Sequence, residues 1–213
     1  MKRTKNPTTH DLQNNEQYEL VNILSHHQIK EFIINQISSG SKLIKGYMYY
    51  QIIMIIIGIF FITRTFILAL RNDFQPLFYL FVGVLFTFTL LILIHELLHA
   101  LAFKLTGAGK VTIGSYLKKF IFYAAADQHV LNRNQFKMVA LMPFVVVKFI
   151  SIAGIVYFIG HPAFYFWIFI VCAHSLFCSG DIGMLDYLYQ EKDSEIYTFD
   201  VQKEKKSYFF RRK

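Results

Sequence analysis

The stretch FQPLFYLFVGVLFTFTLLILIHELLHALAFKL, residues 74–105, decides the fold of this chain. It is long and apolar enough to cross a membrane as a helix, yet its last third contains His95-Glu96-Leu97-Leu98-His99. Residues four apart share one face of a helix, so His95 and His99 can bind one metal ion together. Ionisable side chains are costly in lipid and usually serve a function there. We therefore expect a metal site within a membrane helix.

The whole chain has the composition of a small polytopic membrane protein. Of its 213 residues 54% are hydrophobic, and the apolar residues gather in runs of about 20. Four spans are predicted, at about 47–70, 74–105, 138–160 and 162–180. We expect an all-α membrane protein with about four transmembrane helices and a small strand-bearing cytoplasmic loop.

The distribution of basic residues predicts the orientation in the membrane. Six Lys and Arg precede the first span, six lie around the loop between the second and third spans, and seven lie in the tail. The other two loops hold one and none. By the positive-inside rule, both termini and the middle loop are cytoplasmic in a multi-pass protein of the cell membrane. Topology and anionic lipid headgroups account for the net charge of +8, so no nucleic acid is expected as a partner.

Three regions follow from this reading. Residues 1–46 form a polar region without a cleavable signal peptide, in which Ile29, Phe32, Ile33 and Ile37 recur at helical spacing. That spacing predicts a short helix, either on the membrane surface or packed on the protein. Residues 47–181 form the four-span domain with the metal site, and residues 182–213 form a charged cytoplasmic tail.

The middle loop is rich in β-branched and aromatic residues. A Thr-Gly-Ala-Gly turn at 106–109 precedes Val111, Ile113 and Tyr116, and residues 120–123 read FIFY. This pattern predicts one or two strands that could form a hairpin. Asn132 then has the character of a helix N-cap before the third span.

A catalytic zinc ion usually has three protein ligands and an open position for water. Two histidines and a carboxylate suit Zn²⁺, so we expect one zinc ion per chain. Asp181 is favoured as third ligand because it ends the fourth span at the depth of His95 and His99, between the flexible Gly180 and Gly183. The other candidates for this position are His174, Asp127, His129, His161, Glu191 and Glu195.

His174 lies two helical turns before Asp181 and shares its face. It could replace Asp181 as ligand, could hydrogen-bond to substrate or to an oxyanion, or could be bonded to a neighbouring helix. Cys172 and Cys178 lack the CxxC spacing of paired thiolate ligands and are expected to be buried thiols.

The expected reaction follows from the metal. Zinc lowers the pKa of bound water toward about 7, and Glu96 takes the proton and returns it to the leaving amine. A helical substrate must unwind before its carbonyls are accessible. An edge strand from 110–126 could hold the unwound segment by β-augmentation.

These features resemble a known bacterial family. HELLH at the end of a span, a strand-bearing loop, Pro143 early in the next span and a late Ser-Gly-Asp at 179–181 are similar to a family of zincin peptidases, itself similar to the site-2 intramembrane metalloproteases. The resemblance covers about residues 75–190 and implies that Asp181 is the third zinc ligand. Site-2 proteases have an Asn about two turns earlier, where this chain has His174, and an Asp-Gly pair that Ile182 interrupts here.

The leading hypothesis is thus an intramembrane zinc metalloprotease that cleaves membrane-protein or peptide substrates in the bilayer, with Glu96 as catalytic residue. The alternative is a zinc-binding membrane scaffold without proteolytic activity. A membrane di-iron oxidase needs about eight clustered histidines, and here only His95 and His99 are paired. A peptidase with Glu191 or Glu195 as third ligand would need the tail to fold back onto the second span.

Overall fold

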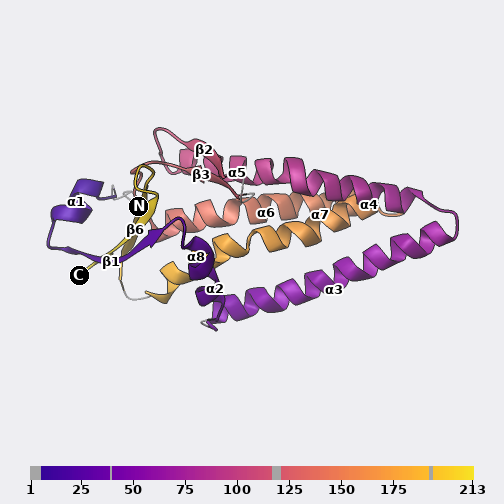
Figure 1. The fold of residues 1–213 in the computed structure, drawn as a ribbon, viewed down its shortest axis with the longest axis horizontal. Coiled ribbons are helices and arrows are strands. Elements are labelled where there is room, and N and C mark those ends of the chain that lie inside the picture. Colours follow the sequence, from indigo (N-terminus) through magenta and orange to yellow (C-terminus); the bar gives the residue numbers. More distant parts are fainter. Residues whose placement is uncertain (1–5, 39, 117–120, 192–193) are drawn as a thin grey trace.

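The helices form an elongated bundle with a small sheet at one end (Figure 1). The computed structural model describes residues 6–38, 40–116, 121–191 and 194–213. Three helical stretches there are long and apolar enough to cross a membrane. They are α3 (Lys42–Leu70), the continuous run of α4 (Gln75–Phe86), η1 (Thr87–Leu91) and α5 (Ile92–Leu105), and α6 (Arg133–Tyr157).

The fourth predicted span is a bent pair of helices. α7 (Phe164–Phe177) and α8 (Ser179–Gln190) meet at an angle of 43°, and together they pass the same test of length and apolarity. The four predicted spans are therefore present if this pair counts as one. The helical structure continues beyond the predicted end at 180, so Asp181 lies in the first turn of a new helix.

Capping residues mark the first residue of a helix more accurately than the start of an apolar run does. The Ser41 side chain accepts a hydrogen bond from the backbone N–H of Ile44, so α3 begins before the apolar run. Asn132 forms a capping box with Gln135, which confirms the predicted N-cap and places the start of α6 at Arg133.

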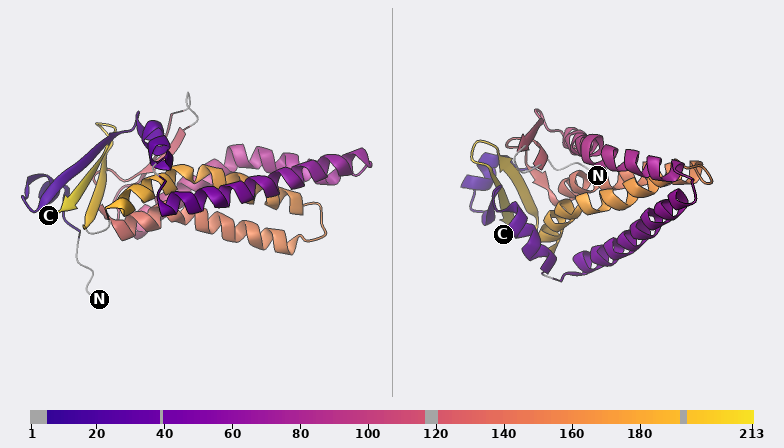
Figure 2. Two further views of the ribbon diagram at one scale, coloured as in Figure 1. Left: turned by 90° about the horizontal axis from the view of Figure 1, so that it is seen from below. Right: turned by 45° about the vertical axis from the view of Figure 1, so that its right-hand side comes forward.

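A four-stranded antiparallel sheet joins both ends of the chain, which the all-α prediction missed. Its order is β1-β6-β5-β4, with β1 at Tyr18–Ser25, β6 at Lys206–Arg212, β5 at Ile196–Val201 and β4 at Leu131–Asn132. Figure 2 shows this sheet, with α1 (Thr9–Asn14), at one end of the bundle. The residues predicted to be a charged tail therefore pair with the N-terminal region.

The predicted N-terminal helix is present as α2 (Ile29–Ser38) and packs on the protein. Its Ile33 is buried and lies against Gly183 of α8, where a Cβ atom would approach the Ile33 Cδ1 to 2.9 Å. The glycine thus allows α2 to approach the helix that carries Asp181 closely.

The middle loop forms the predicted hairpin. β2 (Thr112–Tyr116) pairs antiparallel with β3 (Ile121–Ala125), and β3 packs against α5. Phe120, which the sequence placed in the second strand, lies outside the described residues.

Close packing of α6 on α7 generates a stability prediction. A Cβ atom at Gly154 would lie 2.3 Å from the Trp167 indole, whereas a Cβ atom at Gly46 of α3 would meet nothing within 4 Å. We expect Gly154→Ala to destabilise the protein by about 1–3 kcal/mol through overpacking, measured as a lower melting temperature in detergent. Gly46→Ala is the matched control and should be neutral or stabilising, because alanine has the higher helix propensity. Equal melting temperatures for the two variants would contradict this packing.

Candidate metal centre

Two helices that are far apart in the sequence bring the predicted ligands together. α5 presents His95, Glu96 and His99, all buried, and α8 presents Asp181 from its first turn. The bend at Cys178 turns the chain so that Asp181 faces α5 rather than continuing along the axis of α7. A carboxylate in the first turn of a helix is also favoured by the helix dipole.

Three side chains converge at one point. His95 Nε2 and His99 Nε2 are 3.0 Å apart. Asp181 Oδ2 lies 3.3 Å from His95 Nε2, and Asp181 Oδ1 lies 3.3 Å from His99 Nε2. In a tetrahedral zinc site with Zn–N and Zn–O bonds of about 2.0–2.1 Å, neighbouring ligand atoms are about 3.3 Å apart. The three spacings are close to this value, with the two histidines facing different oxygens of the Asp181 carboxylate.

The hydrogen bonds around the cluster also fit a cation. His99 Nδ1 lies 3.0 Å from the carbonyl oxygen of Val139, and because a carbonyl only accepts, Nδ1 carries the proton. In the neutral ring, His99 Nε2 then presents a lone pair toward the Asp181 carboxylate. Asp181 Oδ2 is buried and has no hydrogen-bond partner of good geometry, despite its short distance to His95. Hydrogen-bond acceptors that face one another in this way need a positive charge between them. Two imidazole nitrogens and a carboxylate are ligands that suit zinc.

Glu96 lies beside the ligands but is not part of the ligand face. It is 9% exposed, and the backbone N–H of Ala124 in β3 points toward its carboxylate. The hairpin therefore sits against the HELLH helix, next to the residue that the sequence assigned as catalytic. Nothing in the sequence pattern pointed to Ala124, because its contribution is a backbone group.

The other candidates for third ligand are engaged elsewhere. Asp127 accepts a hydrogen bond from Gln202, His129 contacts Thr106, and His161 accepts one from Ala163. Glu191 and Glu195 form ion pairs with Arg211 and Arg212 in the terminal sheet. The structure thus brings Asp181 to the histidine pair and leaves these five residues away from it.

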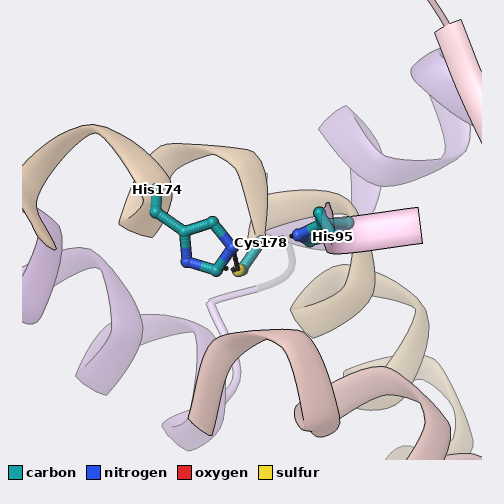
Figure 3. Close-up of side chains that lie close together, drawn as sticks. All are labelled: His95, His174 and Cys178. Atoms are coloured by element: carbon teal, nitrogen blue, oxygen red, sulfur yellow. Dashed lines mark hydrogen bonds between the residues drawn. The ribbon is translucent and has the colours of Figure 1, made fainter. Parts of the chain in front are cut away.

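His174 and Cys178 form a second group that shares His95. Among the described residues, two groups of three could hold a metal ion: His95, His99 and Asp181, or His95, His174 and Cys178. Figure 3 shows the second group, in which the Cys178 sulfur lies beside the His174 imidazole. His174 is fully buried, and its Nε2 is 3.1 Å from His95 Nδ1. Cys172 and Cys178 are free buried thiols, as predicted.

The comparisons with known proteins point to the same region. A family model described as "Putative zincin peptidase" matches residues 88–196, slightly more than half of the chain. The matched segment contains both helices of the cluster and the hairpin between them. No curated protein and no solved structure matches the chain.

The geometry predicts which carboxylate holds the metal. Asp181→Ala should lose most of its zinc, because one of three ligands is removed from a buried site. Glu191→Ala removes a carboxylate from the end of the same helix and should retain zinc near one ion per chain. Zinc is measured by inductively coupled plasma mass spectrometry on purified protein. Full zinc content in Asp181→Ala, or loss in Glu191→Ala, would contradict this ligand set.

Proposed function

Because the chain belongs to this family of zincin peptidases, we propose that it is an intramembrane zinc metalloprotease that hydrolyses peptide bonds of membrane-associated proteins. The observation that carries the proposal is the convergence of His95, His99 and Asp181 beside Glu96, in helices apolar enough to span a membrane. Their position within the spans favours substrates that are themselves in the bilayer over soluble polypeptides.

The chemistry divides between the metal and Glu96. A bound zinc ion supplies Lewis acidity, which makes a water molecule acidic near neutral pH and polarises a carbonyl group. The Glu96 carboxylate accepts a proton from the attacking water and then donates it to the nitrogen of the leaving amine. His95, His99 and Asp181 would hold the zinc ion beside Glu96. Burial of the two histidines and Glu96 limits access by bulk water.

The hairpin offers a place for an unwound substrate. Ala124 directs its N–H toward Glu96, so the edge of β3 that is not paired with β2 faces α5. An extended peptide that adds to this edge would lie alongside HELLH, with its backbone held by hydrogen bonds. This arrangement supports β-augmentation as the mode of substrate binding.

We place the site near the cytoplasmic side of the cell membrane. HELLH lies in the last third of the second span, and Asp181 follows the bend that ends α7, so both are toward the end of the bundle that carries the terminal sheet (Figure 1). The excess of Lys and Arg at the termini and in the middle loop supports the assignment of this end to the cytoplasm.

The test of proteolysis is Glu96→Gln. The amide retains the shape of the side chain but cannot act as a base, so cleavage should fall at least about 100-fold while zinc content stays unchanged. Wild-type and variant protein are incubated with isolated membranes, and newly formed peptide termini are measured by quantitative mass spectrometry. His161→Gln, a substitution in the turn between α6 and α7, is the matched control and should retain cleavage.

Two outcomes would overturn this mechanism. Equal cleavage by wild type and Glu96→Gln would remove Glu96 from the reaction. Stoichiometric zinc with no new termini from any membrane protein would instead support a zinc-binding scaffold.

A further inference from the structure

Pro143 lies inside α6, four residues after Val139, where a helix would normally form a backbone hydrogen bond between the two. Proline has no N–H, so the Val139 carbonyl is left without its helical donor. That carbonyl is the group that accepts from His99 Nδ1 at 3.0 Å. The proline thus makes available, within an otherwise regular helix, the acceptor that orients one of the two metal-binding imidazoles.

The second imidazole has a side-chain acceptor. His95 Nδ1 lies 3.1 Å from His174 Nε2, and His174 Nδ1 lies 3.8 Å from Cys178 Sγ (Figure 3). For His95 Nε2 to bind a metal, the proton of the neutral ring must be on Nδ1, which then donates to His174. His174 must accept through Nε2, so its own proton is on Nδ1, and the Cys178 sulfur lies at nearly equal distances of 3.8 and 3.9 Å from Nδ1 and Nε2.

We propose that Pro143 and His174 are positioning residues that fix His95 and His99 in the tautomer with Nε2 free for the metal. The inference rests on the zinc centre of the proposed function but not on proteolysis. Metal-binding histidines generally donate their second ring N–H to an outer acceptor, and loss of that acceptor costs about 10–100-fold in metal affinity. Here the two acceptors come from α6 and α7, the helices that pack around α5 and α8.

The protonation of His95 disfavours a second metal ion at His95, His174 and Cys178. A metal there would need the Nδ1 position of His95, which must then lose both ring protons to bind two ions. A single proton shared between His95 Nδ1 and His174 Nε2, which are 3.1 Å apart, needs no such double deprotonation. The group is therefore an outer shell of the centre formed by His95, His99 and Asp181.

The experiment measures zinc affinity of the full-length chain in detergent by competition with a chelator. His174→Phe keeps an aromatic ring but has no acceptor, and we expect its zinc affinity to fall about 10–100-fold. His174→Gln supplies a carbonyl oxygen and should restore affinity to within a few-fold of wild type. His161→Gln is the histidine control and should bind zinc as wild type does.

Pro143→Ala separates positioning from a structural role. The alanine restores an N–H that competes for the Val139 carbonyl, so zinc affinity should fall, by less than in His174→Phe because a carbonyl can accept twice. Alanine also favours the helix, so the zinc-free protein should melt at the same or a higher temperature. Pro162→Ala, in the turn before α7, is the proline control and should leave zinc affinity unchanged.

Wild-type zinc affinity in both Pro143→Ala and His174→Phe would overturn the proposal. So would two zinc ions per wild-type chain with one in His174→Phe, since that result assigns His174 to a second metal. If His174→Phe does not fold, wild-type zinc affinity in Pro143→Ala alone would overturn the proposal. If the zinc affinities change as expected but the wild-type protein cleaves no membrane protein, the proposed protease activity is refuted. The positioning roles of Pro143 and His174 are then still supported.

Discussion

Buried hydrogen-bond acceptors that face one another without a donor between them are the constraint on which this structure depends. His95 Nε2, His99 Nε2 and the Asp181 carboxylate meet within 3.0–3.3 Å, and the Asp181 side chain is only 22% exposed. Lone pairs and a carboxylate in this arrangement repel one another unless a proton or a metal ion lies between them. A bound metal ion would therefore hold α5 against α8, and the site is part of the helix packing as well as of the chemistry.

The rest of the fold fixes the helix that carries Asp181. Gly183 allows α2 to pack closely on α8, and the terminal sheet joins β1, β6 and β5 to β4 at the start of α6. Glu191, at the end of α8, forms an ion pair with Arg211 of β6. The two polar ends of the chain thus pack together at the end of the bundle where the metal site lies.

Local signals predicted the parts of the site that depend on nearby residues. The spacing of His95 and His99, the N-cap at Asn132 and the hairpin at 112–125 each require only a few consecutive residues. The terminal sheet could not be predicted in this way, because β1 and β6 are separated by nearly the whole chain and neither strand alternates cleanly. The role of Val139 was equally hidden, because its contribution is a carbonyl, although Pro143 four residues later marks the position where one becomes free. His174 was singled out, but only the structure shows that it contacts His95.

The zinc coordination shell tests the central claim most directly, through X-ray absorption at the zinc edge of the purified full-length protein. The account predicts about four nitrogen and oxygen neighbours at about 2.0–2.1 Å, with the outer-shell scattering of two imidazoles and no sulfur. A sulfur neighbour at about 2.3 Å would place the metal at Cys178 instead. That result, or a protein that binds no zinc, would contradict a centre formed by His95, His99 and Asp181.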